Sequence, residues 1–135
     1  MNSSREDYLI GIYRLTKGEK NFVNSVTLAK HLGVSRASVS EMVKKLTAED
    51  LISFIDNKIE LTEKGTERAK NLISSHRLWE IFLIDHLDMT FDEAHEQAHH
   101  LEHVTGEALK LALNKYLDYP THCPSGKKIW ENISE

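Results

Sequence analysis

Apolar residues recur every three or four positions through most of the chain, which is the pattern of amphipathic helices. Around residues 51–61 the period changes to two, and a polar turn at 56–58 separates predicted strands at 51–55 and 59–61. Gly65 is expected to be tolerated in the first turn of the longest helix. From this periodicity and from capping serine, threonine and asparagine residues, helices are predicted over residues 3–17, 25–33, 35–46, 63–87, 90–104 and 108–117.

The size and composition of the chain favour a small, mainly α-helical protein. Its 135 residues allow one compact domain, or two small ones that share a core, which excludes a large multi-domain enzyme. Hydrophobic residues make up 40% and charged residues 28%, with only two prolines and six glycines. The chain is therefore too apolar to be disordered and too poor in helix breakers to be rich in loops.

The sequence shows no membrane segment and no export signal. Its longest strictly apolar run is 81–84, whereas a membrane span needs about 20 residues. The N-terminal residues lack the apolar stretch of a signal peptide, and the single cysteine, Cys123, has no partner in the chain for a disulfide. We therefore predict a cytoplasmic protein without membrane contact.

Charge is distributed unevenly between two halves, predicted as domains of residues 1–70 and 71–135. The first half holds 12 basic and 10 acidic residues, and the second holds 5 basic and 11 acidic residues. Seven of the eight histidines also lie in the second half. A weakly basic first half indicates contact with a polyanion, and an acidic, histidine-rich second half indicates binding of cations.

The order of elements in the first half is helix, helix, turn, capped helix and hairpin, as in a winged helix-turn-helix. Such a unit presents the N-terminus of a helix to the DNA major groove. Arg36 is placed to read guanine and Glu41 to accept from a cytosine amino group, whereas Lys44 and Lys58 are placed for phosphate. The alternative is a protein-interaction module with a solvated lysine face. The candidate DNA contacts are Ser35, Arg36, Ala37, Ser38, Ser40, Glu41, Lys44 and Lys58.

Histidines and carboxylates gather on two consecutive predicted helices of the second half. His76 and Glu80 lie one turn apart on the first of them. Imidazole and carboxylate ligands without a thiolate suit Fe(II), Mn(II) or Zn(II). These sets predict a metal site, and the alternative is a solvated face rich in histidine, as expected for His31, His86 and His100. At about 100° per residue, four potential ligands share one face of the second helix, namely His95, His99, Glu102 and His103.

The run His99-His100-Leu101-Glu102-His103 also matches H-x-x-E-H, the inverted zinc-peptidase motif. In that interpretation His99 and His103 hold zinc, and Glu102 is the general base that acts on a bound water. The chain is small for such an enzyme, shows no substrate-binding sheet and places the motif behind a DNA-binding unit. We therefore predict that the protein is not an enzyme and has no small organic substrate.

With these residues identified, the sequence resembles the diphtheria toxin repressor / manganese transport regulator family of metal-dependent repressors. The resemblance covers nearly the whole chain, which looks like the short form of the family without a carboxy-terminal SH3-like domain. It implies a mainly α fold, a winged helix-turn-helix followed by a helical dimerisation and metal-binding domain. The segments that carry it are residues 5–9, 34–40, 61–65, 76–78 and 101–104.

The resemblance also implies the metal ligands. One site would use Asp7, His99, Glu102 and His103, and a neighbouring site would use His76, Glu80 and His95. Cys123 matches a cysteine that some manganese-responsive relatives supply from the loop after the last helix. The alternative for this thiol is an unreactive buried position.

Three positions depart from the family pattern. His99 stands where manganese-type members usually have a carboxylate and iron-type members a cysteine. Ile10 stands where a two-manganese arrangement has a glutamate, and Ser125 replaces a histidine. The cofactor is therefore expected to be Mn(II) or Fe(II), with Zn(II) or Co(II) as occupants in vitro.

The function implied is that of a transcriptional repressor in metal-ion homeostasis. The expected partners are a second copy of the chain and double-stranded palindromic operator DNA, with the metal ion as corepressor. Two alternatives stay open at this point. One is a metal-independent winged-helix regulator whose histidines lie on the surface, and the other is the zinc hydrolase described above.

Overall fold

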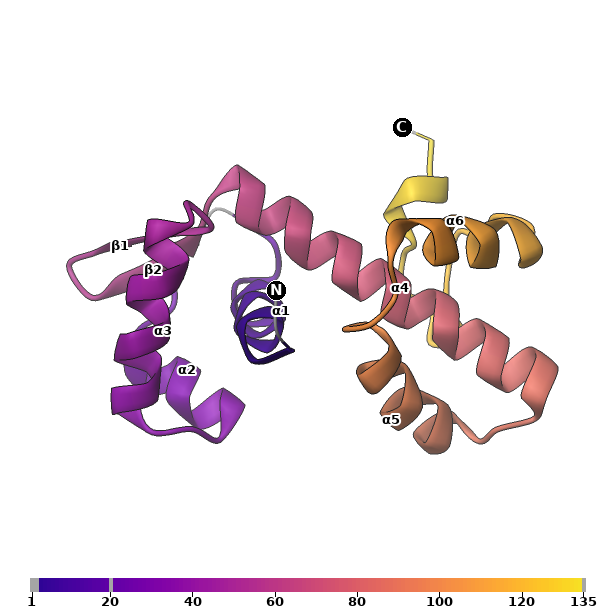
Figure 1. The fold of residues 1–135 in the computed structure, drawn as a ribbon, viewed down its shortest axis with the longest axis horizontal. Coiled ribbons are helices and arrows are strands. Elements are labelled where there is room, and N and C mark those ends of the chain that lie inside the picture. The colour runs from indigo at the N-terminus through magenta and orange to yellow at the C-terminus, as the bar shows by residue number, and fades with distance from the viewer. Residues whose placement is uncertain (1–2, 20, 135) are drawn as a thin grey trace. The chain divides into compact units, whose positions relative to one another are not determined.

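A computed structural model describes residues 3–19 and 21–134 of the chain, and these residues form two compact units (Figure 1). The first unit is Met1–Lys70 and the second is Asn71–Glu135. Helices dominate both units, and the strands of the first unit form a single antiparallel pair. This agrees with the mainly α fold class predicted from the periodicity. Among the described residues, no helix is long and apolar enough to cross a membrane.

The first unit contains the predicted helix-turn-helix, and its helix ends have the expected chemical causes. The elements are α1 (Ser3–Thr16), α2 (Ser25–Leu32) and α3 (Arg36–Ala48). The Asn24 side chain caps α2 by accepting from the Thr27 amide at 2.8 Å. Gly33 ends α2 at a φ of 67°, a left-handed conformation that favours glycine. Ser35 then caps α3 by accepting from the Ser38 amide at 3.0 Å.

The wing is a hairpin of β1 (Ile52–Ile55) and β2 (Lys58–Leu61). The prediction of a turn over 56–58 was wrong by one residue, because Lys58 pairs with Ile55 as part of β2. Only Asp56 and Asn57 form the turn, with φ values of 52° and 61°. Two consecutive residues of positive φ are typical of the two-residue turn that matches the twist of paired strands.

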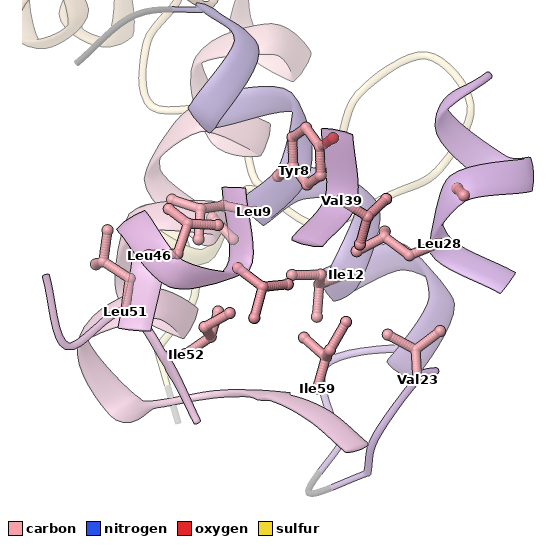
Figure 2. Close-up of a cluster of buried hydrophobic side chains, with 13 residues drawn as sticks. Tyr8, Leu9, Ile12, Val23, Leu28, Val39, Leu46, Leu51, Ile52 and Ile59 are labelled. Carbon is pink, nitrogen blue, oxygen red and sulfur yellow. The ribbon is translucent and has the colours of Figure 1, made fainter. Parts of the chain in front are cut away.

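The core of the first unit is built from one apolar face of each element. α1 contributes Tyr8, Leu9 and Ile12, which point toward side chains of α2, α3 and the wing (Figure 2). All members of this cluster are nearly inaccessible to solvent, which fixes α3 on the wing and on α1. The other buried members are Val23, Leu28, Ala29, Val39, Val43, Leu46, Leu51, Ile52, Ile59 and Ala69.

The long helix α4 (Glu63–Leu87) has the predicted bounds and begins in the first unit. Thr62 caps it by accepting from the Gly65 amide at 3.1 Å. Gly65 is required rather than tolerated, because a Cβ atom there would lie 2.0 Å from the Leu51 carbonyl oxygen. The base of the wing therefore lies directly against the first turn of α4.

The second unit packs α5 (Phe91–Leu101) and α6 (Glu107–Tyr116) with the later part of α4 (Figure 1). Thr90 and Glu93 form a capping box at the start of α5. The prediction that this helix continues to Val104 was wrong, because regular helix ends at Leu101. Residues 102–104 form a turn in which the His103 amide donates to the His100 carbonyl at 3.3 Å.

The C-terminal segment is anchored to α4 and α6 through polar contacts. Buried Lys110 of α6 forms an ion pair with Glu131, and the Ser74 hydroxyl donates to the same carboxylate at 2.7 Å. Glu131 belongs to the short 3₁₀ helix η1 (Trp130–Asn132). An apolar cluster beside these contacts contains Leu78, Ile81, Leu113, Cys123 and Ile129.

Candidate metal centre

Three residues from α4 and α5 form what we call the first histidine group, namely His76, Glu80 and His95. Their potential ligand atoms all lie within 4.8 Å of one another. His76 Nε2 lies 3.5 Å from Glu80 Oε2 and 3.2 Å from His95 Nδ1, and His95 Nδ1 lies 3.1 Å from Glu80 Oε2. His76 and Glu80 are buried, whereas His95 is exposed. The group is therefore a buried pair with one side open to solvent.

The electrostatics of this group favour a positive charge at its centre. Burial opposes a charge on His76, but the hydrogen bonds and negative charges of Glu102 and Glu80 raise the pKa of His76 to about 9. Burial also opposes a charge on Glu80, yet its contacts with His76 and His95 lower the pKa of Glu80 below its ordinary value. A proton on His76 thus supplies, in the metal-free chain, the positive charge that a cation would supply.

The second histidine group consists of His99, Glu102 and His103, at the end of α5 and in the turn that follows. Glu102 is 2% exposed although it carries a carboxylate. Its Oε1 lies 3.5 Å from His99 Nδ1, and its Oε2 lies 3.9 Å from His103 Nε2. The rings of His99 and His103 meet edge to face, with centroids 5.4 Å apart. Two imidazoles and one carboxylate therefore face a common point.

One hydrogen bond connects the two groups. His76 Nδ1 lies 2.7 Å from Glu102 Oε1, while Nε2 of the same ring faces the first histidine group. Glu102 Oε2 is buried and has no hydrogen-bond partner among the residues that the structure describes. A buried oxygen without a hydrogen bond costs about 1–3 kcal/mol, which is recovered only if a cation or a donor contacts it.

The donor chemistry fits a divalent metal ion in each group. Each group offers two imidazoles and one carboxylate, which is a set used by Fe(II), Mn(II) and Zn(II). Both carboxylates are buried, so they are shielded from water and held in place. The predicted helix face brought His99, Glu102 and His103 together correctly. His95, predicted on the same face, instead joins His76 and Glu80 as the resemblance implied.

The resemblance also assigned Asp7 and Cys123 as ligands, and the role of Asp7 stays a prediction because it belongs to the other unit. Asp7 is a half-buried residue of α1, in the first unit. Cys123 is buried in the apolar cluster of the second unit, with its Sγ 3.1 Å from Ser125 Oγ, and it joins neither histidine group. His31, His86 and His100 are exposed, as predicted.

The sequence analysis missed the connection between the groups. It placed Glu102 and His76 in separate sites, because spacing along one helix carries no information about contacts with another helix. One sequence feature pointed toward it. His76 and Glu80 lie one turn apart on the preceding helix, and two such residues, if buried, need polar partners from another element.

The candidate DNA contacts are all exposed residues of the first unit. Ser35, Arg36, Ala37, Ser38, Ser40, Glu41 and Lys44 are all exposed on α3 or at its cap, and Lys58 is exposed on the wing. Lys44 Nζ lies 3.7 Å from Glu41 Oε1, and an ion pair this exposed adds little to the stability of the fold. Lys58 lies 4.7 Å from the Phe22 ring centroid, a cation–π contact that the sequence did not predict.

Comparison with known proteins matches each unit separately. Residues 1–58 match the iron dependent repressor, N-terminal DNA binding domain. Residues 62–131 match the iron dependent repressor, metal binding and dimerisation domain. Together these two matches cover most of the chain and follow the order of its elements.

Individual relatives agree with these matches. An uncharacterized HTH-type transcriptional regulator of Methanocaldococcus jannaschii is 35% identical over 87% of this chain and 98% of its own length. The iron-dependent repressor IdeR of Mycobacterium tuberculosis is 35% identical over 76% of this chain, which spans 45% of that repressor. The solved structure of the manganese regulator SloR is 42% identical, with a TM-score of 0.79 over 93% of this chain and 58% of that one.

Proposed function

This chain belongs to the iron dependent repressor family, and from that premise we propose that it is a metal-dependent transcriptional repressor of metal-ion homeostasis. The observation that carries the proposal is Glu102, a buried carboxylate of the second histidine group that also contacts His76 of the first and has one oxygen without a hydrogen-bond partner among the described residues. A buried charge of this kind is costly for folding alone, and a bound cation explains its presence.

The corepressor we propose is Mn(II) or Fe(II), with Zn(II) or Co(II) able to occupy the groups in vitro. The relatives named above include an iron-dependent repressor and a manganese regulator. The donors of both histidine groups are nitrogen and oxygen, which do not by themselves separate these metals. The metal would supply the positive charge that holds Glu80 and Glu102 together with their histidines.

The proposed partners are double-stranded DNA and a second copy of the chain, which would act together in the cytoplasm. The exposed N-terminal part of α3 would enter the major groove, with Arg36 at base edges and Lys44 and Lys58 at phosphate. The second unit leaves large apolar side chains exposed, which is typical of protein interfaces. A two-fold dimer would read a palindromic operator. The exposed apolar residues include Leu87, Val104, Leu109, Leu111, Tyr116 and Tyr119.

The proposal extends to Asp7 on the strength of the family resemblance. Asp7 would share a metal ion with Glu102, His99 and His103, and so would tie the DNA-binding unit to the metal-binding unit. Metal and operator binding would then strengthen each other reciprocally, by a typical coupling of about 1–3 kcal/mol. Asp7→Ala should abolish the metal response of DNA binding and leave the chain folded.

The test is DNA binding by chelator-stripped protein, with its own upstream region and with a random-sequence pool. Mn(II), anaerobic Fe(II) or Zn(II) is added separately, and binding is followed by fluorescence anisotropy. We expect sequence-specific binding that appears only with metal and is lost in His103→Ala. His100→Ala is the matched control, because His100 is exposed and outside both groups. Specific binding that ignores metal would instead identify a metal-independent winged-helix regulator.

A further inference from the structure

The segment directly before α2 pairs with the wing. The Val23 amide donates to the Ile59 carbonyl at 2.9 Å, and the Ile59 amide donates to the Val23 carbonyl at 2.8 Å. Both side chains are buried and point into the core of the first unit (Figure 2). In the wing turn, the Ser25 hydroxyl donates to Asn57 Oδ1 at 3.3 Å. The wing is therefore tied to this segment at two positions.

Phe22 and Lys58 lie on the outer face of this pairing. Each precedes one of the two buried residues, and successive side chains of paired strands point to opposite faces, so both side chains point away from the core. The register of Val23 with Ile59 makes Phe22 and Lys58 diagonal neighbours, a separation that an aromatic ring and a long side chain can span. Lys58 Nζ accordingly lies 4.7 Å from the Phe22 ring centroid.

The charge of Lys58 stays available for a partner outside the chain. Among residues 3–19 and 21–134 its ammonium forms no ion pair, and its contact is with the Phe22 ring. An ammonium carries three N–H donors, and a ring face engages only one side of it. Lys58 is exposed, so solvent or a bound anion can reach the other side.

Fixing a lysine side chain on a phosphate has an entropic cost, because its four-carbon stem is flexible. A neighbouring ring that already restricts the ammonium reduces this cost, as preorganisation does in other complexes. Phe22 is suited to this role because its backbone is held by the pairing at Val23, while its ring is 48% exposed. A cation–π contact at such an exposed site corresponds to about two- to fivefold in a binding constant.

From this geometry we propose that Phe22 is a positioning residue for DNA binding, which holds the Lys58 ammonium over its ring and presents it to a phosphate of double-stranded DNA. The effect is independent of base sequence, because phosphates are the same at every step. The inference rests on the proposed function, in which Lys58 contacts phosphate, and the experiments below separate the failure of one from the failure of the other.

The first experiment measures binding of the full chain to a random-sequence DNA duplex by fluorescence anisotropy, at low salt and with Mn(II) present. Phe22→Leu removes the ring but keeps an apolar side chain, and Phe22→Met is a second variant without a ring. Both should bind about two- to fivefold more weakly than wild type. Phe22→Tyr is the matched control, because it keeps the ring face and should bind as wild type does.

The second experiment is a double-mutant cycle with Lys58→Gln, which removes the charge. Lys58→Gln alone should weaken DNA binding and reduce the slope of log K against log salt by about 0.9, the value for one phosphate contact. Because the ring acts through the ammonium, Phe22→Leu should cause no further loss when Lys58→Gln is already present. A merely structural role of the ring would give the same loss in both backgrounds.

Each other outcome has a definite meaning. An equal loss from Phe22→Leu with and without Lys58 would overturn the positioning role, as would tighter binding by Phe22→Leu or a Phe22→Tyr chain as weak as Phe22→Leu. Wild-type affinity in Phe22→Leu, with a clear loss in Lys58→Gln, would overturn the role of Phe22 alone. Unchanged affinity and salt slope in Lys58→Gln would overturn the proposed phosphate contact together with the inference. A wild-type chain that binds no duplex DNA would overturn the proposed function as a whole.

Discussion

Replacement of Gly65 by alanine should destabilise this protein, although alanine is the better helix former. Within a helix, alanine is favoured over glycine by about 1 kcal/mol. At position 65 the new Cβ would lie 2.0 Å from the Leu51 carbonyl oxygen and 3.0 Å from its carbonyl carbon. Ordinary contact begins near 3.4 Å, so the two atoms would have to separate by about 1.4 Å.

The carbonyl of Leu51 is not free to move by that amount. It accepts a hydrogen bond from the Thr62 amide at 3.1 Å, and the Leu51 side chain is buried in the core of the first unit. Loss of the hydrogen bond costs about 1 kcal/mol, and forced repacking of a core costs about 1–3 kcal/mol. After the helix gain is subtracted, Gly65→Ala should lower the free energy of unfolding by about 1–3 kcal/mol.

Urea unfolding followed by circular dichroism measures this difference. Gly11→Ala is the matched control in α1, because its added Cβ meets only side-chain atoms, Leu32 Cδ2 at 3.1 Å and His31 Cδ2 at 3.3 Å. Flexible side chains can withdraw, so the control should stay within about 1 kcal/mol of wild type. A Gly65→Ala chain as stable as wild type would refute the close packing of the wing base against α4.

Two further predictions concern the DNA-binding face and the C-terminal anchor. Arg36→Ala should lose about 1–3 kcal/mol of discrimination between operator and random DNA, whereas Lys44→Ala should weaken both equally and reduce the salt dependence. Equal losses on both DNAs for Arg36→Ala would assign that residue to phosphate. Burial opposes the charge of Glu131, but its bonds from Lys110 and Ser74 lower its pKa, so it stabilises the fold above pH 4.5 and less as pH falls. Glu131→Gln should therefore be less stable than wild type at pH 7, and their urea midpoints should converge as the pH falls below 4.5; parallel midpoints would contradict this assignment.

Local chemistry explains why so much of the fold was predictable. The caps at Asn24, Ser35 and Thr62 and the left-handed Gly33 each depend on one side chain and its near neighbours. The spacing of the hydrophobic residues then distinguishes the helices, with a period of three to four, from the strands of the wing, with a period of two. Two of these caps, Ser35 and Thr62, lie in segments that carry the family resemblance, which the two domain matches confirm.

Features that depend on contacts between distant segments were not predictable. The requirement for Gly65 comes from Leu51, the residue directly before β1 and 14 positions earlier in the chain. The division of the histidines into two groups depends on how α5 crosses α4. Periodicity placed His95 with His99 on one helix face, but packing turns His95 toward His76 and Glu80. Only the resemblance anticipated that division.

The end of α5 explains how one chain holds two groups so close together. A regular helix through residue 104 would continue the straight stripe that the sequence predicts. Glu102 still has helical dihedral angles, φ −58° and ψ −30°, and its amide donates to the Ala98 carbonyl at 2.9 Å, so the chain leaves the regular helix only at His103, whose amide donates to the His100 carbonyl. From this last helical position Glu102 reaches His76 on α4 while it still faces His99 and His103. A buried acid in this position adds a desolvation cost, and the cation binding that we propose would account for its placement.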